Sequence, residues 1–390
     1  MYVTRVKVLS VVGARPQFVK LAPVAEVLSA AASQGVQHVI VHTGQHYDRS
    51  MSDALFADLM IPSPDVNLGI GSGSHGAQTG AMLTAMDAVL DEHRPDWVLV
   101  YGDTNSTLAG TLSAVKLHIP VAHLEAGLRS FNRMMPEEHN RVLTDHAADL
   151  LLAPTKTATE HLAREGLGDR TVLVGDVMTD VCLRVRRAVL SGSLPAPDVV
   201  PADLASGFLV ATIHRAENTD DPRRLDAIVG ALAALGTPVL LLAHPRLRVR
   251  AAEHGIRLEQ GSLRVADPVP YIAMVATVLA SRGVVTDSGG LQKEAYLLAR
   301  PCTTIRTETE WVETLEGGWN TLVPDPVDLA TAVSRPLPNA ERAVPYGDGE
   351  AATAVLAALS GHQPRSASYR SSSVGISSRE YSADRWPKSR

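Results

Sequence analysis

Short runs of β-branched and aliphatic residues alternate with amphipathic stretches through the first half of the chain. Residues 7–12 form one such run, and a Gly-Ala-Arg-Pro turn separates them from apolar positions at 18, 21, 22, 25 and 28. This spacing predicts a helix with one buried face. Further strands are predicted at 38–43, 96–101, 119–124 and 150–153. Because strands that alternate with helices pair in parallel through right-handed crossovers, the pattern predicts a doubly wound α/β sheet.

A second series of the same kind follows a stretch rich in proline and aspartate at 194–201. Its predicted strands are 208–213, 238–243 and 283–286. The chain has 390 residues, of which 45% are hydrophobic, and this length suits two domains better than one. We therefore predict an α/β protein with two doubly wound domains and a boundary between about 180 and 205.

Charge and cysteine content narrow the class of protein. The formal net charge of −6 argues against a constitutive nucleic-acid binder. No apolar run approaches the ~18 residues that a membrane span needs. Cys182 and Cys302 are the two cysteines and cannot supply a disulfide framework, which is typical of the reducing cytoplasm. These features predict a soluble cytoplasmic protein that binds neither nucleic acid nor membrane.

The last part of the chain, residues 362–390, has a different composition. It contains nine serines and six lysines or arginines against two acidic residues. It has no period and little to bury, so we predict that it is disordered. Contact of this basic tail with nucleic acid or anionic lipid is an alternative, but a solvated extension is the favoured interpretation.

Polar residues follow predicted strands in both halves of the chain. In open parallel sheets, ligands bind at the carboxyl ends of the strands, so these positions are the first candidates for a site. They include Arg15, Gln45 with His46, Asp103, Glu125, His214, His244, and Asp287 with Ser288. Their spread over both halves predicts a cleft between two domains.

The segment 287–295 reads Asp-Ser-Gly-Gly-Leu-Gln-Lys-Glu-Ala and joins a predicted strand to a predicted helix. Its glycines permit close backbone approach, and Ser288 with the first-turn N–H groups can hold an anion. Glu294 can accept from a ribose hydroxyl. A helix N-cap with tightly packed glycines explains the motif equally well. Arg15 and Lys20 add positive charge at another helix N-terminus.

Carboxylates and arginines are concentrated in 125–141, where three of each lie within 17 residues, and Asp103 follows the preceding strand. Clustered carboxylates suit acid/base chemistry, because like charges and burial separate their pKa values. A surface ion-pair network is the ordinary alternative. Two weaker patterns are set aside. The Gly-x-Gly-x-x-Gly match at 71–76 follows no first strand, and His42 with His46 lacks a third zinc ligand, so no nicotinamide or metal is predicted.

An ordered set of motifs resembles the non-hydrolysing UDP-N-acetylglucosamine 2-epimerase family over roughly residues 5–358. The motifs are Gly13-Ala-Arg-Pro-Gln-Phe-Val-Lys20, Gln45-His46, Tyr101-Gly-Asp-Thr-Asn-Ser-Thr107, His123-Leu-Glu-Ala-Gly-Leu-Arg129, Pro136-Glu-Glu-His-Asn-Arg141, Ile213-His-Arg-Ala-Glu-Asn218, Asp287-Ser-Gly-Gly-Leu-Gln-Lys-Glu-Ala295, Arg306-Thr-Glu-Thr-Glu-Trp-Val-Glu313 and Pro345-Tyr-Gly-Asp-Gly349. Some are weak alone, but in this order they are specific.

The resemblance implies two Rossmann-like domains of the glycosyltransferase-B type facing a central cleft, a homodimer, and no required cofactor. The implied domains are 1–185, with the acid/base residues, and 186–345, with the nucleotide site. A helix at 346–361 would cross back to the first domain, and the tail at 362–390 matches nothing in the family.

The resemblance also implies the reaction: UDP-N-acetylglucosamine and UDP-N-acetylmannosamine interconvert by elimination of UDP, through a 2-acetamidoglucal, and re-addition. The implied acid/base residues are Asp103, Glu125, Glu137 and His214. The implied substrate contacts are Arg15, Lys20, Arg141, His244, Ser288, Gly289, Gly290, Glu294 and Arg306. A regulatory second site would use Gln45, His46, Gln78 and Arg215.

Three departures from the family pattern mark a subgroup. Gln17 stands where many relatives have glutamate, Ala216 where many have a second arginine, and Trp311-Val312 where an Arg-Pro pair is common. The alternative functions would use the same two-domain fold. Water or an acceptor such as a nucleobase could trap the intermediate, or the protein could be a glycosyltransferase or a nucleotide-sugar sensor without turnover.

Overall fold

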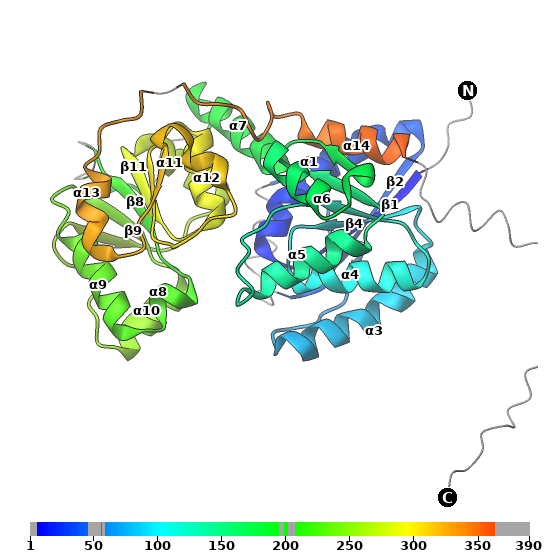
Figure 1. The fold of residues 1–390 in the computed structure, drawn as a ribbon, viewed down its shortest axis with the longest axis horizontal. Coiled ribbons are helices and arrows are strands. Elements are labelled where there is room, and N and C mark those ends of the chain that lie inside the picture. Colours follow the sequence, from blue (N-terminus) through cyan, green and yellow to red (C-terminus); the bar gives the residue numbers. More distant parts are fainter. Residues whose placement is uncertain are drawn as a thin grey trace, which may run out of the picture.

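The structure is a computed structural model that describes residues 6–45, 56, 59–194, 199–201, 204, 207–339 and 341–362. The described residues form two bodies, each built on a parallel sheet with helices packed against it (Figure 1). The predicted α/β class and the two sheets are confirmed. The prediction of a disordered tail falls outside the described residues, apart from His362.

The first sheet has the strand order β3-β2-β1-β4-β5-β6-β7, and the pairings are parallel. Alternate residues of its first strand enter opposite cores, with Val8 on one face and Leu9 on the other. A continuous apolar strand is what a sheet covered on both faces requires. The strands are β1 (Val6–Val12), β2 (Val36–His42), β3 (Val66–Asn67), β4 (Trp97–Tyr101), β5 (Val121–Leu124), β6 (Leu150–Ala153) and β7 (Thr171–Leu173).

Helices of the first body begin at residues that suit a helix N-terminus. The Thr104 hydroxyl accepts from the Thr107 N–H at the start of α4, and Pro136 is the first residue of α5. The helices are α1 (Arg15–Ala30), α3 (His75–His93), α4 (Asn105–Lys116), α5 (Pro136–Ala147) and α6 (Lys156–Arg164), with short 3₁₀ turns at Ala31–Gln34 and Gly168–Arg170.

The second sheet has the order β10-β9-β8-β11-β12-β13 and is also parallel. Its strands are β8 (Leu209–Thr212), β9 (Val239–Leu242), β10 (Leu263–Ala266), β11 (Gly283–Thr286), β12 (Cys302–Thr304) and β13 (Asn320–Leu322). Its helices are α8 (Ala216–Thr219), α9 (Pro222–Ala233), α10 (Pro245–Glu253), α11 (Tyr271–Ala280), α12 (Gly289–Leu297) and α13 (Leu329–Val333), with 3₁₀ segments at Val312–Gly318 and Pro326–Asp328.

One helix contacts both bodies, and the helix at 351–361 returns the chain to the first. Helix α7 (Val177–Leu190) packs against α1 and α14 on one side and against α11 and α12 on the other. Helix α14 (Ala351–Gly361) lies beside α1, far from the sheet that precedes it in the sequence (Figure 1). The Asp180 carboxylate of α7 accepts from the N–H groups of Ala351 and Ala352, and this contact fixes where α14 begins.

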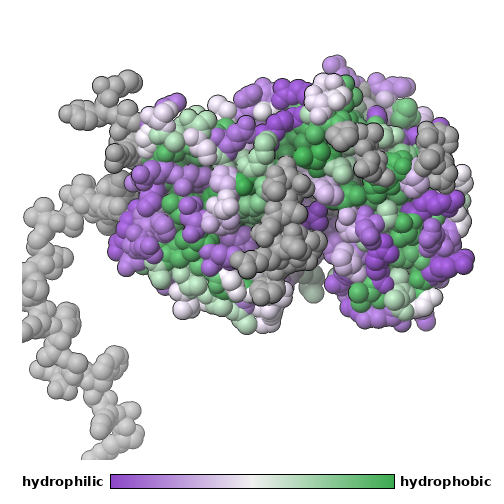
Figure 2. All heavy atoms as spheres, turned by 180° about the vertical axis from the view of Figure 1, so that it is seen from behind, coloured by the Kyte–Doolittle hydropathy of each residue, from purple (hydrophilic) through white to green (hydrophobic). Residues whose placement is uncertain are grey.

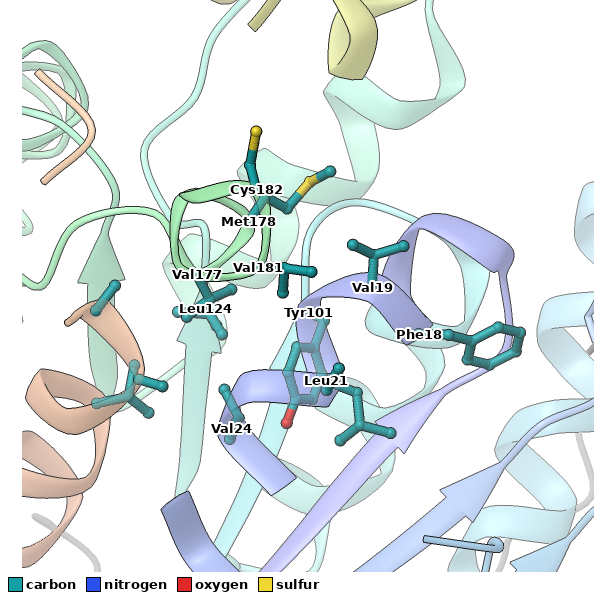
Figure 3. Packing of buried hydrophobic residues seen from close by; sticks show 14 of the residues in the cluster. Phe18, Val19, Leu21, Val24, Tyr101, Leu124, Val177, Met178, Val181 and Cys182 are labelled. Atoms are coloured by element: carbon teal, nitrogen blue, oxygen red, sulfur yellow. The ribbon is translucent and has the colours of Figure 1, made fainter. Parts of the chain in front are cut away.

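One hydrophobic cluster extends from the first sheet through α1 and α7 to α12 and α14. Tyr101 of β4 is fully buried in it and lies with Leu21 and Val24 of α1 (Figure 3). Seen from behind, the surface mixes hydrophilic and hydrophobic residues, and an indentation separates the two bodies (Figure 2). In the part of the chain that the structure describes, no helix combines the length and apolar character needed to cross a membrane.

Candidate active site

A cleft of about 1060 Å³ is lined by the loops that follow strands of both sheets. In each sheet the order reverses beside a central strand, β1 in the first and β8 in the second, which is where ligands of open α/β sheets bind. Of the residues singled out in the sequence, the first body contributes Arg15, Lys20, Asp103, Glu125, Glu137 and Arg141 to the lining, and the second contributes His214, Arg215, His244, Ser288, Gly289, Gly290 and Glu294.

Asp103 follows β4 and is held by Arg141 of α5, whose Nε lies 3.1 Å from Asp103 Oδ2. Burial alone would raise the pKa of Asp103, but the Arg141 and Lys20 cations outweigh it and hold the pKa below its ordinary value. Asp103 is therefore a carboxylate at neutral pH, with the charge that a proton acceptor needs.

Glu125 follows β5 and forms an ion pair with Lys20 of α1, and both side chains are less than one-tenth exposed. Burial would lower the pKa of Lys20, but Glu125 and Asp103 raise it above its ordinary value. Glu125 has a φ of +75°, a conformation that costs a non-glycine residue on the order of 1–3 kcal/mol. Such strain persists only where surrounding contacts impose it, and here it turns the carboxylate into the cleft.

Glu137 differs from these two carboxylates because it is exposed in the first turn of α5. Its neighbour Glu138 is buried instead. Glu138 accepts from the backbone N–H groups of Ser130 and Phe131 and from Arg141 Nη1, at 2.9–3.0 Å. Glu138 therefore fixes the loop before α5, and Glu137 is left facing the cleft.

On the opposite wall, His214 is positioned by the buried carboxylate of Asp287. His214 Nδ1 lies 3.0 Å from Asp287 Oδ1, and the same carboxylate accepts from the backbone N–H groups of His214 and Arg215. Burial would raise the pKa of Asp287, but its contacts with His214 hold it below the ordinary value. His244 lies with its ring centroid 5.6 Å from that of His214. Burial, with His214 and Arg15 nearby, lowers the pKa of His244.

Helix α12 presents its N-terminus to the cleft through Ser288, Gly289 and Gly290. First-turn N–H groups have no partner within a helix, and together with the helix dipole they favour an anion. A Cβ atom on Gly289 would lie 2.6 Å from Oε1 of Glu310, so a larger residue here would have to displace the Glu310 side chain.

Four further residues line the cleft: Tyr271, Lys293 and Glu310, none of them a candidate from the sequence, and Trp311, noted there only as a departure from the family pattern. Lys293 is fully buried, pairs with Asp176 and lies 3.8 Å from the Trp311 ring centroid. Burial raises the pKa of the neighbouring Glu294 to about 7, and Lys293 only partly offsets this. The motifs at 287–295 and 306–313 contain three of these residues, so position within a motif was an available signal. Tyr271 carried none.

Arg306, Gln45 and Gln78 were singled out in the sequence but do not line the cleft. Arg306 is buried and donates from Nη1 to Glu310 Oε2 at 3.0 Å. Gln45 accepts from the Ser106 N–H and hydroxyl, and Gln78 accepts from Asn105 Nδ2 at 2.8 Å, so both belong to a polar cluster behind the wall. His46 lies outside the described residues.

Contacts also run directly between the two bodies. Asn132 Nδ2 donates to Glu308 Oε1 at 2.6 Å, and Arg15 Nη2 donates to the Val269 carbonyl at 3.3 Å. Charged groups on one wall of the cleft also affect the pKa of a carboxyl group on the other wall. Burial would raise the pKa of Glu310, but Arg306 and then Arg141 of the opposite body lower it.

Solved structures that superpose on most of the chain show that its fold is of the glycosyltransferase-B type. A crystal structure of Methanocaldococcus jannaschii UDP-GlcNAc 2-epimerase in complex with UDP-GlcNAc and UDP is 37% identical in sequence, with a TM-score of 0.80. The similarity covers 91% of this chain and 99% of that one.

Sequence comparison defines the family within that fold. The family model described as UDP-N-acetylglucosamine 2-epimerase matches residues 29–360. A Pseudomonas aeruginosa UDP-2,3-diacetamido-2,3-dideoxy-D-glucuronate 2-epimerase is 47% identical, over 84% of this chain and 91% of its own length. A Methanococcus maripaludis UDP-N-acetylglucosamine 2-epimerase is 38% identical, over 90% and 97%. The chain belongs to the UDP-N-acetylglucosamine 2-epimerase family, and the resemblance drawn from its motifs is confirmed.

Proposed function

We propose that the protein inverts carbon 2 of a UDP-N-acetylhexosamine, UDP-N-acetylglucosamine in the first instance, by eliminating UDP and adding it back. One observation carries the proposal. Carboxylates of Asp103, Glu125 and Glu137 line one wall of the cleft, and the N-terminus of α12 lines the other. Acid/base groups and an anion-binding group thus line the same cleft. The proposed reaction needs both, because it breaks a C–H bond and a C–O bond of the same sugar.

The diphosphate belongs at the N-terminus of α12 in this proposal. The amides of Gly289 and Gly290, with the hydroxyl of Ser288, would stabilise the charge that develops on departing UDP. Glu294, one turn further along α12, would accept from a ribose hydroxyl. This direction of binding leaves the sugar next to the loops that follow β4 and β5.

The proton at carbon 2 is weakly acidic, so its removal requires a carboxylate while the bond to UDP breaks. Return of the proton to the opposite face requires a second group across the ring. Asp103, held ionised by Arg141, and Glu125, paired with Lys20, are two carboxylates in different electrostatic surroundings. Glu137 and His214 complete the set. Bridges such as Asn132–Glu308 support a closed cleft that retains the glucal intermediate.

A second substrate class is favoured by one comparison. The 47% identical P. aeruginosa relative is named for a UDP-2,3-diacetamido-glucuronate. That sugar adds an acetamido group at carbon 3 and a carboxylate at carbon 6, and a carboxylate needs a cation in the cleft. Arg15 and Arg215 are cationic side chains of the lining. The ratio of kcat/KM for the two sugar nucleotides decides between these substrates.

The proposed function is tested by incubating the protein with UDP-N-acetylglucosamine and following the anomeric protons by NMR. The expected result is the growth of a second sugar nucleotide until the two reach a constant ratio. Free UDP accumulating in step with free N-acetylmannosamine would identify a hydrolysing enzyme instead. Product that forms only with an added acceptor would indicate a specialised transferase.

We also propose a homodimer in the cytoplasm. The family resemblance supports the dimer, and so does the outer face of α3, which exposes the small uncharged residues Ala77, Ala81, Thr84 and Ala88. The two buried free thiols, Cys182 and Cys302, support a reducing compartment. Sedimentation equilibrium tests the dimer, with Ala81→Arg expected to give the monomer mass.

A regulatory second site also remains a proposal. Gln78 Nε2 lies 3.5 Å from the Gln45 carbonyl, so these two residues are at least adjacent, and Arg215 lines the cleft. Initial rates with UDP-N-acetylmannosamine alone should rise when a trace of UDP-N-acetylglucosamine is added. A hyperbolic, unchanged response would exclude the second site.

A further inference from the structure

His123 is a fully buried residue of β5 that binds two different segments through its two ring nitrogens. Its Nδ1 lies 2.6 Å from Asp145 Oδ1 of α5, and its Nε2 lies 2.6 Å from the carbonyl oxygen of Gly102. Both His123 and Asp145 have no exposed surface. Neither belongs to the lining of the cleft, so the proposed reaction does not use them directly.

The geometry fixes where the protons are. A carbonyl oxygen only accepts, so Nε2 carries a hydrogen. Burial would raise the pKa of Asp145, but His123 and Arg129 outweigh it and hold the pKa below its ordinary value. Asp145 is therefore a carboxylate that accepts, and Nδ1 carries a hydrogen too. Both ring nitrogens of His123 therefore face acceptors, an arrangement that a doubly protonated ring satisfies.

One of these hydrogen bonds holds the loop that presents Asp103. The carbonyl of Gly102 belongs to the same planar peptide unit as the Asp103 N–H. A hydrogen bond to that carbonyl therefore fixes the orientation of the peptide that precedes Asp103. Gly102 has a φ of +61°, which makes the turn after β4 sharp. The Gly102 N–H donates to Leu124 of β5 at 2.9 Å, so both ends of this residue are tied to β5.

The partner of His123 holds the loop that presents Glu125. Asp145 Oδ2 accepts from the Gly127 N–H at 3.1 Å and from Arg129 Nη1 at 2.7 Å. Glu125 and Gly127 both have positive φ, at +75° and +84°, and the N–H of Glu125 donates to the Leu152 carbonyl. Asp145 is thus one of the contacts that keep the strained turn at Glu125 in place.

We propose that His123 and Asp145 form a buried charged pair that positions Asp103 and Glu125 together, so that one device sets the spacing of two acid/base groups. The inference rests on the proposed function, in which these two carboxylates act on one sugar. His123 and Asp145 are positioning residues, because they reach the sugar only through the backbone of the loops after β4 and β5.

The test compares His123→Gln, Asp145→Asn and the double variant with the wild-type full chain. Glutamine has one donor nitrogen and one acceptor oxygen where histidine presents two ring nitrogens, and asparagine removes the carboxylate charge that faces His123. Thr144→Val is the matched control, because Thr144 is buried next to Asp145 on α5 and its hydroxyl has no hydrogen-bond partner in the described part of the chain. Active sites are counted by UDP binding, so that unfolded protein does not enter kcat.

Each single variant is expected to lower kcat per UDP-binding site by roughly 10- to 100-fold, the scale of loss from misplacing a reacting group by about 1 Å. The affinity for UDP should change less than about threefold, because the proposed nucleotide contacts lie in the other body. The double variant should lose little more than the worse single variant, since the pair acts as a unit. A purely structural role would lower the melting temperature and leave kcat per binding site unchanged, and that result would overturn the proposal.

A second measurement does not depend on activity. In wild-type protein labelled with ¹⁵N-histidine, the His123 resonances, assigned by their absence in His123→Gln, should show a bound proton on both ring nitrogens. A ring with one unprotonated nitrogen would overturn the charged pair. If the wild-type protein turned over neither sugar nucleotide, the proposed function would fail, and this spectrum would still decide whether the pair exists.

Discussion

Lys20 Nζ and the Glu125 carboxylate form an ion pair in the wall of the cleft, with side chains that are 8% and 9% exposed. Lys20 comes from α1 and Glu125 from the loop after β5, so the pair joins two elements on the same side of the site. Asp103 adds a second negative charge near the lysine. Lys20 therefore balances two of the carboxylates on which the proposed chemistry depends.

Removal of this cation should have a large effect on stability. Lys20→Met leaves Glu125 buried beside Asp103 without its counter-charge, and loss of one partner of a buried pair costs about 3–5 kcal/mol. Urea unfolding at neutral pH measures the change in the free energy of unfolding. The exposed Lys116, changed to methionine, is the control and should lie within about 0.5 kcal/mol of wild type. A Lys20→Met protein as stable as this control would show that the pair contributes nothing.

The acid/base assignment predicts a common effect from four substitutions. Asp103→Asn, Glu125→Gln, Glu137→Gln and His214→Ala should each lower kcat at least ~100-fold, the lower range for a positioned acid/base group. UDP binding, measured by calorimetry, should persist in all four. Near-normal turnover in all of them would mean that the carboxylate cluster is only structural.

The two glycines at the start of α12 should respond differently to alanine. In Gly289→Ala the new methyl group would meet Glu310, which Arg306 holds in place, so we expect a loss of roughly 1–3 kcal/mol in unfolding free energy. In Gly290→Ala the nearest atom is the Ser288 hydroxyl at 3.9 Å, so the fold should be as stable as wild type or slightly more stable. Equal stabilities of the two variants would contradict the packing described here.

The pH dependence of stability should carry a contribution from Glu294. Burial raises its pKa to about 7 from 4.5, so between these values the folded protein holds a proton that the unfolded chain releases. Stability from this group is fully present below pH ~4.5 and is lost as the pH rises through ~7, with a slope of at most about 1.4 kcal/mol per pH unit.

The unfolding free energy of the Glu294→Gln variant is subtracted from that of the wild-type protein at each pH. The slope of this difference against pH is the contribution of Glu294. Burial also raises the pKa of Asp180 to about 6, but Asp180 is present in both proteins and cancels in the difference. A difference that stays flat, or that grows with rising pH, would show that Glu294 is ionised throughout.

Strands with nearly continuous apolar runs, such as β1 and β4, could be predicted from the sequence because burial on both faces leaves a clear signal. Strands β3 and β13 could not, since two or three residues carry no period. The burial of Lys293 also could not be predicted, because a lysine in a helix normally faces solvent. Its burial depends on Asp176 and Trp311, which lie far away in the sequence.

Gln17 stands where many relatives have glutamate, and its hydrogen bonds in the structure explain this difference. Its Oε1 accepts from the N–H groups of Gly13 and Ala14, and its Nε2 donates to the Tyr101 carbonyl at 2.8 Å. An ionised glutamate has no donor for that carbonyl, so the amide closes the turn between β1 and α1. The substitution is therefore accommodated by hydrogen bonds within the first body.

In the proposed reaction, the carbon–hydrogen bond at carbon 2 breaks and re-forms within the cleft. Incubation with UDP-N-acetylglucosamine in heavy water tests it most directly, because a proton returned from a side chain that has exchanged with solvent carries deuterium. We expect a second sugar nucleotide with deuterium at carbon 2 and loss of the carbon-2 proton signal in step with turnover. A second sugar nucleotide formed with its original proton retained at carbon 2, or no exchange at that carbon at all, would contradict it.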